Sequence, residues 1–212
     1  MKYDSLIFDM DGTLWDAVDS YVEVWNTTSR ELGVDRLVTR DDLLRYMGKT
    51  IDVIYSALMD GVDIAPDVYL RRLDYNESLL MPRLGGRLYR GVTEGIRELA
   101  SRYRLFMVSN CGQDGLRNML KFCGLTDCFE GTLTHGETGR GKDYNIAAIV
   151  REYNLQAPLY IGDTQGDSDA AHAAGVDMCH VTWGFGSCRD AELSFDSFPA
   201  MTKALLEAKS NN

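Results

Sequence analysis

Long apolar runs are missing from this sequence. No stretch approaches the roughly 20 apolar residues that a membrane-spanning helix requires, and Met1 to Phe8 lack the apolar segment of a signal peptide. Cysteine is also scarce: the chain has five, with no C-x-x-C pair, and its three histidines form no H-E-x-x-H pattern. These absences argue against a membrane protein, a disulfide framework and a zinc site, and we expect a cytoplasmic protein with reduced thiols.

The chain has fewer basic than acidic residues. The 22 lysines and arginines stand against 32 aspartates and glutamates, which leaves a formal net charge of −10. An acidic chain is a poor match for nucleic acid or for an anionic membrane surface, so we expect neither as a partner. An anionic small molecule would need a local positive site. The 212 residues can bury a hydrophobic core, and they are compatible with a monomer but leave the oligomeric state open.

The stretch SLIFDMDGTL, residues 5–14, has the strongest local pattern. A short apolar run, Leu6 to Phe8, predicts a buried strand that ends in Asp9 and Asp11, with Gly12 directly after them. Residues two apart in extended chain point the same way, so the two carboxylates would share a small volume. Like charges at such a distance require a cation or a raised pKa. An acidic surface turn has the same local pattern, so this stretch alone does not decide between them.

A long helical stretch follows. Apolar residues recur at helical spacing in four segments, and no strand pattern interrupts them. Asp16 can cap the first segment, and Thr39 with Asp42 has the spacing of a capping box at the second. Short loops predict that neighbouring helices run antiparallel as a bundle. The first helix is expected to begin after Asp16 and to end at Leu32. The others are expected over residues 39–47, over residues 51–58, and from Pro66 to Pro82, which should end the last helix.

From residue 86 onward, strand and helix patterns alternate. Short apolar runs are expected to form strands at 105–108, 129–134, 159–161 and, as the last strand, 178–182. Alternation of this kind predicts a parallel, doubly wound α/β sheet. Because the opening strand must join that sheet, the helical stretch interrupts one core. We expect a core of residues 1–15 and 86–212 and a helical cap of residues 16–85.

Polar residues end several of these strands. Ser109 and Asn110 follow one strand, Asp163 follows another with Asp167 four residues later, and Lys142 begins a helix. In a parallel sheet these ends share one edge with Asp9 and Asp11. A carboxylate can act as a nucleophile toward phosphorus, and Mg²⁺ prefers oxygen ligands such as Asp9 and Asp163. Lys142 and Ser109 would stabilise charge on phosphoryl oxygens.

At this level the chain resembles the haloacid dehalogenase (HAD) superfamily, in its phosphatase branch with a helical C1-type cap similar to phosphoglycolate phosphatases. The resemblance covers nearly the whole chain and rests on four motifs in order. They are the DxDGT of Asp9 to Thr13, Ser109 in VSN, Lys142 in GKD, and the GDxxxD of Gly162 to Asp167. The resemblance implies a Rossmann-like core with an inserted cap.

The resemblance also implies roles. Asp9 would be the nucleophile that forms an aspartyl-phosphate, and Asp11 the general acid and then the base for water. Asp9, the backbone carbonyl of Asp11 and Asp163 would hold Mg²⁺, with Asp167 in support, although Asp167 has an alternative role as a helix cap. The candidate substrate-binding residues are Thr13, Asn110 and Lys49. Thr13 and Asn110 could equally shape loops, and Lys49 could equally be a surface charge.

Residues in which the chain differs from particular branches of the family reduce the number of activities that we expect. Because Asp11 is present, the dehalogenase and phosphonatase members, which lack an acid there, are disfavoured. Tyr21 stands where the β-phosphoglucomutase branch has a histidine, which favours a hydrolase. We therefore expect a Mg²⁺-dependent phosphatase acting on a small phosphorylated metabolite. The alternatives are a phosphotransferase or mutase, a receiver-like signalling domain and a non-catalytic binding protein, and the cap loops do not identify the ester.

Overall fold

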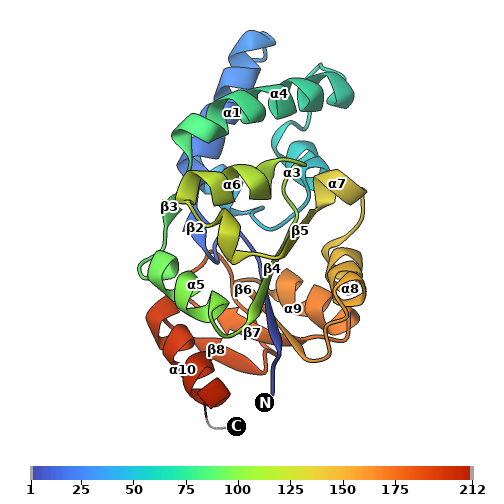
Figure 1. Cartoon of the computed structure of the whole chain (residues 1–212). Helices are drawn as coiled ribbons and strands as arrows, with labels where there is room; N and C mark the ends of the chain where they lie inside the picture. Colours follow the sequence, from blue (N-terminus) through green and yellow to red (C-terminus); the bar gives the residue numbers. More distant parts are fainter. Residues whose placement is uncertain (1, 211–212) are drawn as a thin grey trace.

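The centre of the molecule is a parallel β-sheet. The computed structural model describes residues 2–210. Six strands form the sheet: β1 (Ser5–Phe8), β4 (Arg104–Ser109), β5 (Gly131–Thr134), β6 (Pro158–Gly162), β7 (Asp177–Val181) and β8 (Leu193–Phe195). Their order is β5-β4-β1-β6-β7-β8, and all neighbours run parallel. The predicted α/β class is confirmed (Figure 1).

Helices cover both faces of this sheet, so β1 is buried on both sides. Leu6 and Phe8 belong to one apolar cluster, and Ile7, between them, belongs to a second cluster on the other face. The helices of the first face are α5 (Val92–Ala100), α6 (Gly115–Cys123) and α10 (Phe198–Ser210), and those of the second are α8 (Lys142–Glu152) and α9 (Gln165–Ala173). Short helices η1 (Thr126–Cys128) and α7 (His135–Thr138) flank β5.

The strand order reverses at β1. The chain continues from β1 to β4 and β5 on one side, and then crosses to β6, β7 and β8 on the other. In open α/β sheets, ligands bind outside the carboxyl ends of the strands at such a switch point. The ends of β1, β4 and β6 therefore form the natural position for a site.

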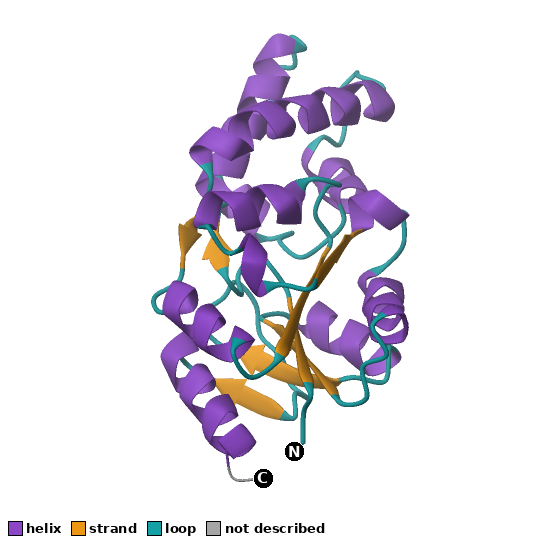
Figure 2. Cartoon of the chain, viewed as in Figure 1, coloured by secondary structure: helices purple, strands orange, loops and turns teal. Residues whose placement is uncertain are grey.

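The inserted helices lie beyond this edge of the sheet, as Figures 1 and 2 show. They are α1 (Val18–Glu31), α2 (Arg40–Leu44), α3 (Ile51–Leu58) and α4 (Pro66–Leu84). α1 packs on α4, where the rings of Trp25 and Tyr69 lie 5.7 Å apart and the Ser29 hydroxyl lies 2.9 Å from that of Tyr69. Between insertion and sheet, β2 (Trp15–Asp16) pairs antiparallel with β3 (Arg87–Leu88), a two-stranded connection that the sequence pattern did not predict. No helix within residues 2–210 is long and apolar enough to cross a membrane.

Two of the predicted helix ends are wrong. The second cap helix was expected over 39–47, but α2 ends at Leu44, although the Thr39–Asp42 capping box at its start is present. Pro82 was expected to end the fourth helix, yet α4 continues to Leu84 and stops at Gly85, whose φ is 59°. A proline in the last turn removes only one N–H donor, so the left-handed glycine ends the helix instead.

The carboxyl-terminal end of the fold also differs from expectation. Residues 178–182 were predicted as the last strand, but β8 extends the sheet beyond β7. α10 then covers the first face, where Phe198 and Met201 are fully buried. β8 has only three residues and a weak apolar pattern, so its sequence does not predict a strand. These residues form a strand because they pair with the edge of the sheet.

Candidate active site

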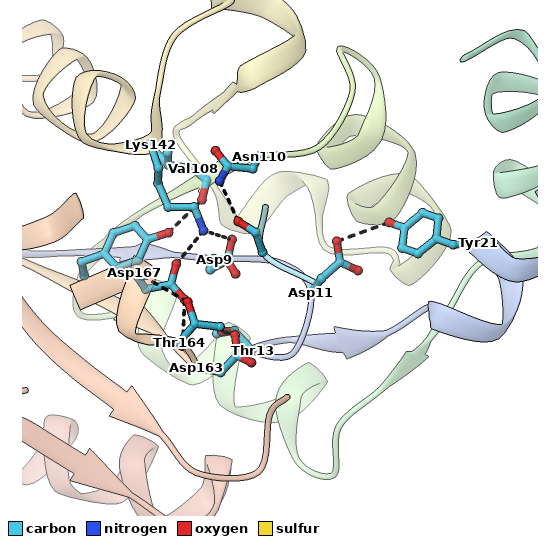
Figure 3. A network of polar contacts seen from close by, with 12 residues as sticks. Asp9, Asp11, Thr13, Tyr21, Val108, Asn110, Lys142, Asp163, Thr164 and Asp167 are labelled. Atoms are coloured by element: carbon cyan, nitrogen blue, oxygen red, sulfur yellow. Dashed lines mark hydrogen bonds and ion pairs between the residues drawn. The ribbon is translucent and has the colours of Figure 1, made fainter. Parts of the chain in front are cut away.

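Lys142 and Asp9 form a buried ion pair at the carboxyl end of β1. The Lys142 ammonium donates hydrogen bonds of 2.9 Å to Oδ1 of Asp9 and 2.6 Å to Oδ1 of Asp167 (Figure 3). Their side chains are at most 6% exposed. Burial lowers the pKa of Lys142, but the charges of Asp167 and Asp9 outweigh it, and the pKa lies well above its usual value. The lysine therefore stays charged between two carboxylates.

Asp167 is both a helix cap and a charge partner. It is the third residue of α9, and its Oδ2 accepts hydrogen bonds from the backbone N–H and hydroxyl of Thr164 in a capping box. Its Oδ1 faces Lys142. Burial acts to raise its pKa, but Lys142 and Thr164 lower it below the usual value. The helix-cap role expected from the sequence is therefore confirmed, and the other carboxylate oxygen pairs with Lys142. Support of a metal by Asp167 stays a prediction.

Asp163 lies in a pocket made by two glycine-containing turns. Its Oδ2 accepts a 2.7 Å hydrogen bond from the backbone N–H of Phe185, and the Thr13 hydroxyl lies 3.5 Å from Oδ1. Gly12 has a φ of +82°, and a Cβ there would lie 2.3 Å from Asp163 Oδ2. A Cβ on Gly184 would come equally close to Asp163. Only glycine fits at these two positions, which brings both turns against the carboxylate.

The carboxylates of Asp9, Asp163 and Asp167 fit a divalent cation. Each offers an oxygen, and these oxygens lie within 4.8 Å of one another. Burial raises the pKa of Asp9 to about 6 and that of Asp163 to about 7, with neighbouring carboxylates adding to both shifts. When all three carboxylates are ionised, they leave two negative charges in excess of the single ammonium of Lys142. A buried oxygen site with that excess suits Mg²⁺.

Asp11 is turned away from this group toward the cap. Trp15 Nε1 donates to its Oδ1 at 3.0 Å. The Tyr21 hydroxyl donates to its Oδ2 at 3.3 Å (Figure 3). Burial, together with the Asp9 charge, raises the pKa of Asp11 well above its usual value. A carboxyl group of this kind can hold a proton near neutral pH and donate it.

A cavity of about 140 Å³ extends from these groups into the cap. Its core end is lined by Asp9, Asp11, Ser109, Asn110 and Lys142. Its cap end is lined mainly by apolar side chains of the inserted helices. Asn110 crosses the boundary, because its Nδ2 donates a 2.8 Å hydrogen bond to the carbonyl of Gly48 in the loop between α2 and α3. The cap is thus held over the site.

The candidate substrate-binding residues predicted from the sequence differ in their position relative to the cavity. Lys49 is exposed and lies at the rim of the cavity, while Thr13 is fully buried, does not line the cavity and contacts Asp163. Substrate binding by Thr13, Asn110 and Lys49 stays a prediction. Sequence reasoning missed Glu77, which lines the cap end of the cavity. A glutamate in the middle of a helix such as α4 has the pattern of a solvated helix face.

A comparison with protein families identifies the chain. A model of the haloacid dehalogenase-like hydrolases matches residues 6–181. The chain belongs to this family. As a member it is a hydrolase. Three of its four motifs lie at the ends of β1, β4 and β6, and the fourth, with Lys142, begins α8.

Individual members of the family resemble the chain over most of its length. A phosphoglycolate phosphatase of Nitrosospira multiformis is 28% identical over 218 residues, covering 96% of this chain and 93% of the relative. The pyrophosphatase PpaX of Listeria welshimeri is 25% identical over 189 residues, covering 86% and 84%. Among solved structures, a predicted phosphoglycolate phosphatase from Haemophilus somnus superposes with a TM-score of 0.84 at 20% identity, covering 97% of this chain and 99% of that one. This last likeness concerns the fold alone.

Proposed function

We propose that this hydrolase is a Mg²⁺-dependent phosphatase that cleaves a small phosphomonoester through an aspartyl-phosphate on Asp9. The observation that carries the proposal is the Lys142 ammonium, held between Asp9 and Asp167 at the core end of a cavity. This cation is positioned to attract a phosphoryl group to the nucleophile. The name of the relative called a phosphoglycolate phosphatase supports phosphate ester hydrolysis as the reaction.

In the first step, a carboxylate oxygen of Asp9 attacks phosphorus, and the bond between phosphorus and the ester oxygen breaks. Asp11, whose pKa is raised well above its usual value by burial and the Asp9 charge, would donate its proton to the leaving oxygen. The alcohol departs uncharged. Lys142 and the Ser109 hydroxyl would stabilise the charge on the phosphoryl oxygens.

In the second step, Asp11 has become a carboxylate and takes a proton from water as the water oxygen attacks phosphorus. The bond between phosphorus and Asp9 breaks, and inorganic phosphate leaves. The cap, held by the contact between Asn110 and Gly48, would exclude bulk water while the intermediate exists.

The metal residues of the proposal are Asp9, Asp163 and Asp167, with the backbone carbonyl of Asp11. Mg²⁺ bound there would neutralise negative charge on the phosphoryl oxygens. Asp167 would support the site indirectly as well, by holding Lys142.

The test is phosphate release, with Mg²⁺, from a panel of small phosphate esters that includes phosphoglycolate, and from pyrophosphate, a phosphoanhydride. These two compounds are chosen because they appear in the names of relatives. Asp9→Asn should abolish release, and the native chain quenched in acid during turnover should carry a phosphoryl group on Asp9. Asp19→Asn, at an exposed side chain of α1, is the matched control and should keep full activity. Full activity of Asp9→Asn, or transfer of the phosphoryl group to a sugar in place of water, would contradict the proposal.

Two further points belong to the proposal. Residues 16–85 would form a cap domain and residues 1–15 with 86–212 the catalytic core, which the position of the β2–β3 connection supports. The protein would act in the cytoplasm, in keeping with five cysteines that are all free.

A further inference from the structure

The cap end of the active-site cavity has a distinctive lining. Its walls are mostly apolar side chains from all four cap helices or the loops beside them, among them Trp25, Leu43, Met47, Ile54, Leu70 and Leu73. Two acids of α4, Asp74 and Glu77, complete the wall. The cavity thus places an apolar surface and two carboxyl groups opposite the phosphate end, where the leaving group of a phosphate ester would lie.

Glu77 faces the reaction centre. Its charge contributes to the raised pKa values of Asp11 and Tyr21. The Glu77 side chain is half-buried, and none of the hydrogen bonds and ion pairs found within residues 2–210 involves it. Burial and the Asp74 charge raise the pKa of Glu77 to about 7. An acid in an apolar wall without a cationic partner is a group that a positively charged ligand would stabilise.

The positively charged side chains of the cavity lining do not pair with these two acids. Among the described residues that line it, the positively charged ones are Lys49 and Lys142. Lys142 is already paired with two carboxylates. Lys49 follows Gly48, whose carbonyl contacts Asn110 at the core boundary, and its side chain is exposed. Among the described residues, no ion pair or hydrogen bond joins either lysine to Asp74 or Glu77.

We propose, resting on the phosphatase function above, that the leaving group of the substrate has a short apolar body and a positively charged nitrogen, which Asp74 and Glu77 recognise. The class is a phosphate ester of an amino alcohol or a quaternary ammonium alcohol. A second anionic group, such as a carboxylate or a second phosphate, would face these two acids and be rejected. Glu77 and Asp74 are thus specificity-determining residues.

Three esters test the proposal with the native, Mg²⁺-loaded protein. They are phosphocholine, its neutral isostere in which carbon replaces the nitrogen, and phosphoglycolate, whose leaving group is anionic. We expect kcat/KM for phosphocholine to exceed that for the isostere by at least about tenfold, with phosphoglycolate poorest of the three. The isostere has the same shape, so the difference between the first two reports the charge.

Variants assign the effect to the residues. In Glu77→Gln combined with Asp74→Asn, the ratio between phosphocholine and the isostere should fall to within about threefold, because the carboxylates are gone. Asp67→Asn removes a charge from an exposed position of the same helix and should leave the ratio at its native value. Because the readout is a ratio within one variant, a partly unfolded preparation does not distort it.

Three outcomes would overturn the inference: equal kcat/KM for phosphocholine and the isostere, phosphoglycolate as the best of the three esters, or a native ratio in the double variant. Failure of the proposed function has another signature. If no ester is hydrolysed, or hydrolysis survives Asp9→Asn, the reaction itself is wrong. If the isostere is hydrolysed in an Asp9-dependent way but charge makes no difference, only the assignment to Asp74 and Glu77 fails.

Discussion

The hydroxyl of Tyr21, on a cap helix, lies 3.3 Å from Oδ2 of Asp11, on the core. Trp15 Nε1 holds the other oxygen of the same carboxyl group at 3.0 Å. Both donors come from the segment that leads into the cap and its first helix. The position of the proposed general acid therefore depends on the position of the cap, which couples closure to proton transfer.

Replacing Tyr21 by Phe should lower kcat about tenfold, because Asp11 loses one of the two groups that orient it. The hydrogen bond from Tyr21 also lowers the pKa of Asp11. Its loss should therefore move the alkaline limb of the kcat/KM profile to higher pH. Tyr75→Phe, at a tyrosine of α4 that is 52% exposed, is the control and should leave rate and profile unchanged. An unchanged pH profile in Tyr21→Phe would show that the contact does not govern Asp11.

Gly12→Ala should destabilise the fold by about 3 kcal/mol, since it adds both left-handed backbone strain and a clash. The clash is with the Asp163 carboxylate, 2.3 Å from the added Cβ. Gly33→Ala is the matched variant, because Gly33 has a φ of +67° but nothing within 4 Å of its Cβ position. It should cost about 1 kcal/mol and leave activity intact. Chemical denaturation measures both, and equal losses would mean that the contact with Asp163 is unimportant.

Mg²⁺ should stabilise the native protein against heat, by about 2.7 kcal/mol at a concentration of 100 times Kd. Asp163→Asn should abolish this response. In the absence of metal the same variant should melt at a higher temperature than the native chain, because it removes a buried carboxyl group whose pKa is raised to about 7. Asp127→Asn, in the short helix η1, serves as the control. An equal Mg²⁺ response in Asp163→Asn would exclude this carboxylate as a ligand.

Glu77 should make stability depend on pH. Its pKa rises from 4.5 to about 7 on folding, so the folded chain holds a proton that the unfolded chain has lost between these values. Its contribution is present below pH 4.5 and is lost as the pH rises through 7. Glu77→Gln should match the native chain at pH 5 and exceed it at pH 8 by about 1–2 kcal/mol, a figure reduced for the partial exposure of the side chain.

Denaturant titrations at both pH values measure this effect. Glu94→Gln, at an exposed position of α5, should follow the native chain at each pH. A constant difference between Glu77→Gln and the native chain would contradict the pH argument.

Much of the site was predictable because its residues follow local rules. Asp9, Ser109 and Asp163 each follow an apolar run, and parallel strands bring such ends together whatever else the chain does. The capping boxes at Thr39 and Thr164 each join two residues three positions apart, so both partners can be recognised in the sequence.

Local sequence patterns specify the buried strands, the helical insertion and the polar residues at the strand ends, because each depends on neighbours within a few positions. Which groups face one another across the chain depends on how the elements pack in three dimensions. Tyr21 contacts Asp11, Thr13 lies against Asp163, and Glu77 joins the cavity wall because helices and turns distant in sequence pack together. β8 likewise exists through pairing with β7, which its own residues do not specify.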